Sequence, residues 1–111
     1  MPYDEELAQR IRALVATERG LTEKKMFGGL AFLVGGNMAV AASGQGGILV
    51  RVGPERSERL EATTGASVAV LGGRPRPGWL RVGAADVRTK RQLTRWVDLG
   101  VGFARSLPAK R

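Results

Sequence analysis

The stretch MFGGLAFLVGGNMAVAASGQGGILVRV, residues 26–52, contains three apolar runs separated by two glycine-rich segments. The runs span 26–34, 38–42 and 48–52, and each includes at least one of the β-branched residues that favour strands. The segments between them are typical of tight turns, because glycine and asparagine adopt positive φ at low cost. The pattern therefore predicts three consecutive antiparallel strands joined by short turns.

Two glycines, Gly28 and Gly29, interrupt the first of these runs. Glycine inside a strand marks a bulge or a close approach by another backbone. We expect one of these features here, with backbone geometry rather than chemistry as the reason for both glycines. Lys24 and Lys25 precede the run, and we expect them to be solvated residues at a sheet edge, where charge discourages edge-to-edge pairing.

Helical patterns lie outside this central region. Residues 4–18 have apolar side chains at i, i+4, i+7 and i+8, and Asp4 is placed to cap their start. Residues 54–62 begin with a proline, which the first helical position tolerates. At Thr89 a capping-box pattern opens a third helix, which ends before Pro108.

Between the second and third helices, residues 67–71 and 79–82 are predicted to be strands. The intervening 72–78 contain two prolines and three glycines, a composition that predicts a loop. The third helix carries Trp96 and Phe103 on its apolar side, where we expect core positions. The resulting order is α-β-β-β-α-β-β-α. It predicts an α+β fold of two layers, with an antiparallel sheet of about five strands and helices on one face.

Length and composition narrow the possible function classes. The 111 residues suit one domain, 1–111, and the chain contains neither cysteine nor histidine. Disulfides, thiolate nucleophiles, Ser-His and Cys-His catalysis and zinc sites with Cys or His ligands are therefore excluded. The first residues, MPYDEE, are acidic where a secretory signal is basic and then apolar, and no apolar run approaches the ~20 residues of a membrane span. We expect a cytoplasmic protein with no membrane partner.

Catalytic and nucleotide-binding motifs are absent from the sequence. No segment matches the phosphate-binding loop GxxxxGK[S/T], and after Gly44 and Gly46 the third glycine of a dinucleotide fingerprint is replaced by Leu49. There is no GxSxG elbow, and no loop gathers the acidic residues into a metal-binding cluster. We predict no enzyme activity, no catalytic residues, no cofactor and no metal.

The net charge of +8 is distributed unevenly. Residues 1–71 hold as many acidic as basic residues, so the whole excess falls in residues 72–111, which contain only Asp86 and Asp98 as acids. Such asymmetry attracts polyanions, although basic residues also serve simply to solubilise a small domain. The candidate residues for binding nucleic acid or another polyanion are Arg74, Arg76, Arg81, Arg88, Lys90, Arg91 and Arg95.

Trp79 is the candidate stacking residue of this region. It follows directly after two arginines that alternate with prolines, and a tryptophan beside arginines can stack on a base or on an aromatic partner. The alternative is a tight surface loop whose tryptophan folds into the core.

The sequence resembles the N-terminal domain of the TfoX/Sxy family, bacterial proteins linked to the regulation of competence. The resemblance extends over nearly the whole chain and rests on blocks that occur in the same order: YDEEL at 3–7, KKMFGGLAF at 24–32, NM at 37–38, LVRVG at 49–53, GRP at 73–75, GW at 78–79, WV at 96–97 and FA at 103–104. Arg76 departs from the family pattern, since relatives often have an apolar residue there. Longer relatives carry a second, C-terminal helical domain.

The resemblance implies an α+β fold like that of secretion chaperones and a role in the transcriptional control of DNA uptake through a partner regulator, with no established enzyme activity. We therefore expect a non-enzymatic regulatory domain that contacts a protein partner and has possible affinity for nucleic acid through its basic C-terminal third. The alternative is a homodimeric interaction module with no nucleic-acid role. In that case the apolar run 38–42, expected near the sheet edge, would pair or pack across a twofold axis.

Overall fold

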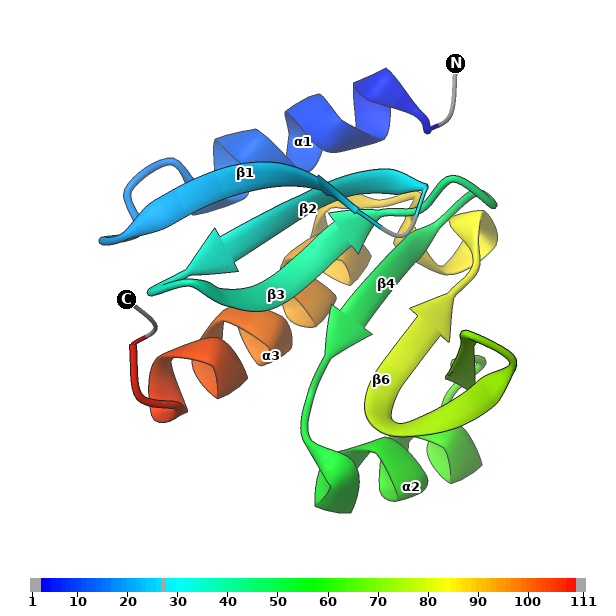
Figure 1. The fold of residues 1–111 in the computed structure, drawn as a ribbon. Coiled ribbons are helices and arrows are strands. Elements are labelled where there is room, and N and C mark those ends of the chain that lie inside the picture. Colours follow the sequence, from blue (N-terminus) through cyan, green and yellow to red (C-terminus); the bar gives the residue numbers. More distant parts are fainter. Residues whose placement is uncertain (1–2, 27, 110–111) are drawn as a thin grey trace.

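The computed structural model describes residues 3–26 and 28–109 and shows helices packed on an antiparallel sheet (Figure 1). Within these residues, six strands pair in the order β1-β2-β3-β4-β6-β5, and every neighbouring pair is antiparallel. Along the chain the elements are α1 (Glu5–Val15), β1 (Leu21–Met26), β2 (Gly29–Val34), β3 (Asn37–Ala42), β4 (Ile48–Arg51), α2 (Pro54–Thr63), β5 (Ser67–Leu71), β6 (Arg74–Val82), the 3-10 helix η1 (Ala84–Val87) and α3 (Lys90–Ser106). The predicted α+β class is confirmed, and the order of elements matches the prediction except that the sheet has six strands, with one more strand between α1 and α2 than expected.

The prediction of a single strand over residues 26–34 is wrong, because the chain turns within this range. β1 and β2 form a hairpin, and Gly28 lies in its turn with φ +74°. β1 was missed because its sequence, LTEKKM, is largely polar, as suits an edge strand whose residues are mostly exposed. The expected close approach is found at Gly29, where a Cβ would lie 2.0 Å from the carbonyl oxygen of Ala42.

The segment predicted as a loop, 72–78, is also wrong in part, because β6 begins at Arg74. Arg74 and Pro75 pair with β5, whereas β6 pairs with β4 only from Trp79 onward. The two prolines therefore lie where β6 has one strand neighbour, and there the missing N–H groups interrupt no second ladder.

Two helices, α1 and α3, lie behind the sheet and bury the main core (Figure 1). The N-terminal helix is capped as predicted, since the Asp4 carboxylate accepts from the N–H of Leu7 at 3.1 Å. The predicted capping box of α3 is present as well. Trp96 is buried as expected, but Phe103 is only half-buried, because it lies at the end of the sheet beside Gly53. The larger core cluster includes Ile11, Val15, Leu93, Val97, Phe32, Val40, Ile48, Val50, Leu80 and Val82.

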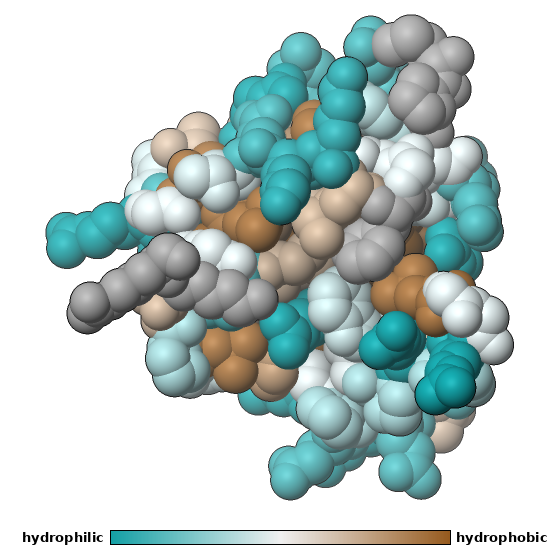
Figure 2. Space-filling view, in the orientation of Figure 1, coloured by the Kyte–Doolittle hydropathy of each residue, from teal (hydrophilic) through white to brown (hydrophobic). Residues whose placement is uncertain are grey.

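We call the opposite side of the sheet, which α1 and α3 do not cover, the open face. A smaller apolar cluster lies there, formed by Ala31, Met38, Ala41, Leu49 and Ala69, with Met26, Leu33, Leu71 and Trp79 partly buried against it. Figure 2 shows apolar side chains in the middle of this view, with hydrophilic side chains around them.

The sheet edges are β1 and β5, so β3 is an internal strand. The expectation that 38–42 lies near an edge is therefore wrong, because β2 and β4 occupy both of its sides. Lys24 and Lys25 are exposed on the edge strand β1, as expected. On β5, the N–H of Val68 donates to the Glu61 carboxylate of α2 at 2.7 Å.

Polar contacts attach the peripheral segments to this framework. Arg12 of α1 donates two hydrogen bonds to Glu23 of β1, at 2.7 and 2.8 Å, and these lower the pKa of the Glu23 carboxyl below its ordinary value. The buried Asn37 donates its amide to the carbonyl oxygen of Pro108 at 2.9 Å, which holds the segment after α3 beside the β2–β3 turn.

Helix α3 lies close to the backbone of the sheet at Gly100. The register of β2 and β3 shifts between Phe32 and Leu33, opposite Ala39. A Cβ on Gly100 would lie 2.4 Å from the carbonyl oxygen of Ala39 and 2.9 Å from a methyl group of Val50. Only a residue without a side chain fits this contact.

Replacing Gly100 and Gly102 by alanine tests this contact, because both glycines lie in α3 and gain the same helix propensity. A Cβ on Gly102 meets nothing within 4 Å, so G102A raises the free energy of unfolding by up to about 1 kcal/mol. G100A is expected to lower it by about 1–3 kcal/mol, because the methyl group overpacks a buried site. Urea denaturation followed by circular dichroism measures both values, and equal stabilisation by the two substitutions would contradict the close approach.

Candidate polyanion-binding surfaces

The first set of candidate residues lies on β6. Arg74 and Arg76 are exposed in the half of the strand that pairs only with β5. Trp79 and Arg81 follow on the open face, because Leu80 and Val82 alternate with them and point into the main core. We call Arg74, Arg76, Trp79 and Arg81 the hairpin group.

The second set lies at the start of α3. Lys90, Arg91 and Arg95 are exposed and, with Thr94 and Asp98, line a shallow hollow of about 670 Å³. Arg88 precedes them after η1, and its carbonyl accepts a hydrogen bond from Arg10 of α1 at 3.1 Å. We call Arg88, Lys90, Arg91 and Arg95 the helix group.

The seven basic candidates do not form one face. The helix group belongs to the layer behind the sheet (Figure 1). Arg81 lies on the open face, since its neighbours Leu80 and Val82 point into the main core. The structure thus divides the basic C-terminal third into two surfaces that a single small ligand does not span. A polyanion that contacts both would have to pass around the molecule.

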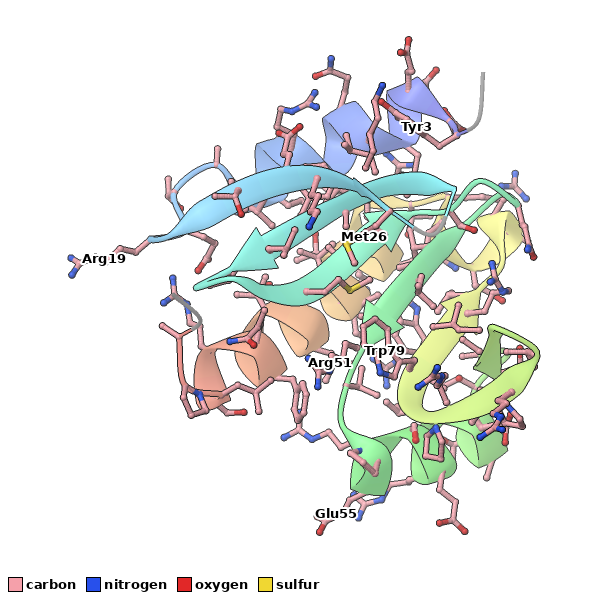
Figure 3. All side chains as sticks on the ribbon, in the orientation of Figure 1. Tyr3, Arg19, Met26, Arg51, Glu55 and Trp79 are labelled. Carbon is pink, nitrogen blue, oxygen red and sulfur yellow. The ribbon has the colours of Figure 1, made fainter. Side chains whose placement is uncertain are left out.

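Trp79 has a different environment from the one expected. Its ring is half-buried on the apolar cluster of the open face, and the guanidinium carbon of Arg51 lies 5.1 Å from the ring centroid (Figure 3). The predicted alternative, a tryptophan that folds into the core, is met in part, since the ring packs on this cluster. Stacking of Trp79 on a base or an aromatic partner stays a prediction. The arginine beside the ring, Arg51, comes from β4 and not from the proline-containing segment.

Acidic residues are distributed unequally over the fold. Strands β2 to β6 contain no aspartate or glutamate, and the one acidic residue of β1, Glu23, pairs with Arg12 of α1. The open face therefore presents Lys24, Arg51 and Arg81 without any carboxylate from the strands beneath them. Arg81 is held by a hydrogen bond from its guanidinium to the Ser43 hydroxyl at 2.9 Å.

Two basic residues of these surfaces, Arg10 and Arg51, were missed in the sequence. Both belong to residues 1–71, where the charges sum to zero, so net charge does not single them out. Arg51 had a usable signal, because strand alternation places it on the side of Leu49 and away from Val50. For Arg10 the signal is absent, since its contact with Arg88 joins segments 78 residues apart.

In residues 3–26 and 28–109, no group of three or more Asp, Glu, Cys or His side chains could hold a metal ion. No helix in this part of the chain is long and apolar enough to cross a membrane.

Comparison with known proteins gives one match. A family model described as the TfoX N-terminal domain matches residues 13–104, well over half of the chain. The matched region begins within α1 and ends within α3, so it includes the whole sheet. No curated protein and no solved structure matches the chain.

The position of the hairpin group depends on Ser57, which is buried in α2. Its hydroxyl accepts from the N–H of Gly78 at 2.8 Å, just before Trp79. S57A leaves this buried N–H without its acceptor, so we expect the free energy of unfolding to fall by about 1–3 kcal/mol. Hydrogen exchange at Gly78 should accelerate as well. The exposed Ser67 provides the control, because S67A should change the stability by less than about 0.5 kcal/mol. Equal effects of S57A and S67A would refute the role of this hydrogen bond.

Proposed function

Because the chain belongs to the TfoX N-terminal domain family, we propose that it is a competence-related regulatory domain that acts by binding a protein partner. The observation that carries this proposal is the family match across residues 13–104. The family is not known as an enzyme family. We also propose that the protein acts in the cytoplasm, where a transcription regulator would be available to it.

The structure supports contact through surfaces rather than chemistry on a small substrate. The helix group lies in the layer behind the sheet, whereas Trp79 and Arg81 of the hairpin group lie on the open face beside its apolar cluster. A transcription regulator that presents acidic and apolar residues would complement the open face, where the strands contribute cations and no carboxylates.

Affinity capture tests the proposal. Immobilised protein is incubated with lysate of the source cells, with and without nuclease, and the retained proteins are identified by mass spectrometry. We expect a transcription regulator to be retained in both samples, because direct protein contacts survive removal of nucleic acid. Loss of every specific protein after nuclease treatment would overturn the proposal and would favour a nucleic-acid bridge.

Nucleic-acid binding is a second candidate function, supported by the helix group. Lys90, Arg91 and Arg95 are exposed along the first half of one helix, and none of the ion pairs found in the described residues involves them. The three cations line one hollow, and Asp98, which borders the same hollow, opposes contact with phosphates. We propose that any affinity for duplex DNA comes from this group.

The salt dependence of DNA binding tests this second function. Engagement of about four phosphates gives a slope of log K against log salt near −3.6. The triple variant K90Q/R91Q/R95Q should reduce the slope by about 2.7, because each lost phosphate contact removes about 0.9. The double variant R74Q/R76Q, which removes two positive charges from the hairpin group, is the control. Fluorescence anisotropy with a labelled duplex gives the slopes, and a wild-type affinity that ignores salt would eliminate this function.

A homodimer formed through the sheet edge has less support. Pairing two copies of β1 side by side would bring Lys24 and Lys25 of both copies together, and like charges on paired strands repel. At the other edge, the N–H of Val68 is already bonded to Glu61.

A further inference from the structure

The strands β3 and β4 separate soon after they begin to pair. In the described part of the chain they share three residue pairs, from Ala42–Ile48 to Val40–Val50. β4 then stays with β6, where Arg51 pairs with Trp79, and the chain continues through Val52 into α2. An opening therefore lies between the end of β4 and the C-terminal half of α3.

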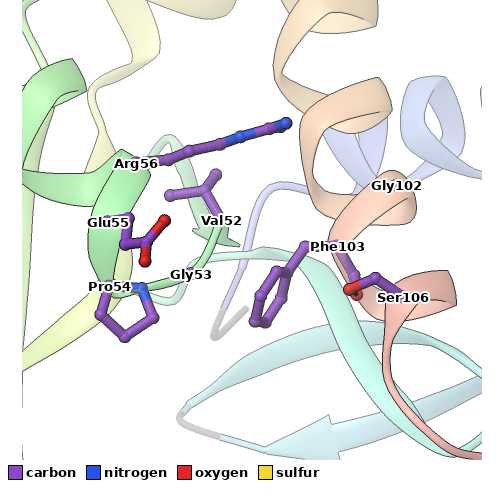
Figure 4. Close-up of a pocket in the computed structure, with 8 residues that line it drawn as sticks. All are labelled: Val52, Gly53, Pro54, Glu55, Arg56, Gly102, Phe103 and Ser106. Atoms are coloured by element: carbon purple, nitrogen blue, oxygen red, sulfur yellow. Dashed lines mark hydrogen bonds between the residues drawn. The ribbon is translucent and has the colours of Figure 1, made fainter.

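This opening is a cleft of about 560 Å³ (Figure 4). One wall is formed by the end of β4 and the start of α2, and the other is formed by α3. Phe103 packs directly against the backbone of Gly53, where a Cβ would lie only 2.7 Å from the ring. The lining residues are Val52, Gly53, Pro54, Glu55, Arg56, Gly102, Phe103 and Ser106.

Arg51 ends β4 and lies beside this cleft, close to the rings of Trp79 and Phe103, of which Phe103 lines the cleft. Its guanidinium carbon is 5.1 Å from the ring centroid of Trp79 and 5.4 Å from that of Phe103. Stacking on aromatic faces orients a guanidinium and leaves its N–H groups able to bind a carboxylate in the plane of the guanidinium. Over residues 3–26 and 28–109, no carboxylate pairs with Arg51.

The charges around the cleft are also unequal. Arg51 and Arg56 contribute two positive charges, and Figure 4 shows the Arg56 side chain extending from α2 toward α3. Glu55 is the one carboxylate among the lining residues, and it is directed into the space between α2 and α3 (Figure 4). The cleft thus has the apolar ring of Phe103 in one wall, two cations, of which Arg51 is stacked, and one opposing carboxylate.

We infer that this cleft receives a segment of an acidic protein partner, with an apolar side chain against Phe103 and a neighbouring carboxylate on Arg51. The inference rests on the proposed function, because it specifies where the partner binds and by what chemistry. Pro54, Glu55, Arg56, Gly102 and Ser106 are exposed, so the cleft opens to solvent along its length. A side chain that projects from a larger partner fits such an opening, whereas small-molecule sites enclose most of their ligand.

A labelled peptide tests the cleft directly. The probe is a blocked hexapeptide with phenylalanine and leucine between two pairs of aspartates, and binding is measured by fluorescence anisotropy. R51M keeps a long side chain between the two rings but removes the charge-assisted hydrogen bonds, so we expect about tenfold weaker binding. E55Q removes the opposing carboxylate and should tighten binding about two- to fivefold. A gain of affinity cannot result from misfolding.

Two controls separate this site from general attraction to a basic protein. R91M removes the same charge from the exposed helix group and should change the affinity by less than about twofold. A peptide with lysines in place of the aspartates should not bind. Equal weakening by R51M and R91M, no change with E55Q, or no binding of the acidic peptide to the wild-type protein would each overturn the inference.

The capture experiment distinguishes failure of this inference from failure of the proposed function. If the wild-type protein retains a partner and R51M releases it while R91M does not, both statements are supported. If R51M retains the same partner, the cleft is not its binding site, and the proposed function stands. If neither protein retains a specific partner, the proposed function fails, and the peptide titration still decides the chemistry of the cleft.

Discussion

The backbone of Gly78 determines where β4 ends and where α2 begins. Its carbonyl accepts from the N–H groups of Val52 and Gly53, at 2.8 and 3.2 Å, and its own N–H donates to Ser57. These bonds hold the chain after β4 against β6 and away from β3. The φ of +96°, and the 3.0 Å from a Cβ to the nitrogen of Pro54, require glycine at this position. The orientation of α2, the cleft and the placement of Arg51 all follow from this contact.

The sequence predicted those parts of the fold that have local signals. Helix caps and apolar periodicity are local signals, because they depend on residues a few positions apart. The structure confirms the caps at Asp4 and Thr89 and the apolar faces of α1 and α3. β1 was missed because an edge strand needs no apolar alternation. The start of β6 was missed because proline argues against a strand only where both sides are paired, and the number of neighbours is a property of the whole sheet.

The candidate surfaces were less predictable, because the number of charged residues in a segment does not show on which side of the fold their side chains lie. The excess of arginine in residues 72–111 is real, yet the fold sends Arg81 to the open face and Lys90 to the helix layer. Arg51 was overlooked in a segment of zero net charge, although its neighbours across space are Trp79 and Phe103. Phe103 was assigned to the core by helical periodicity, which gives the direction of a side chain but not how far the sheet extends beneath it.

The short contact between β3 and β4 has a mechanical consequence. In the part of the chain that the structure describes, these strands share three residue pairs, whereas β1 and β2 share six. Among the described residues the β3–β4 ladder has the fewest residue pairs in the sheet, and α3 contacts both of its strands. Local opening of the sheet should concentrate at this ladder, and α3 should limit its amplitude because it packs on both strands.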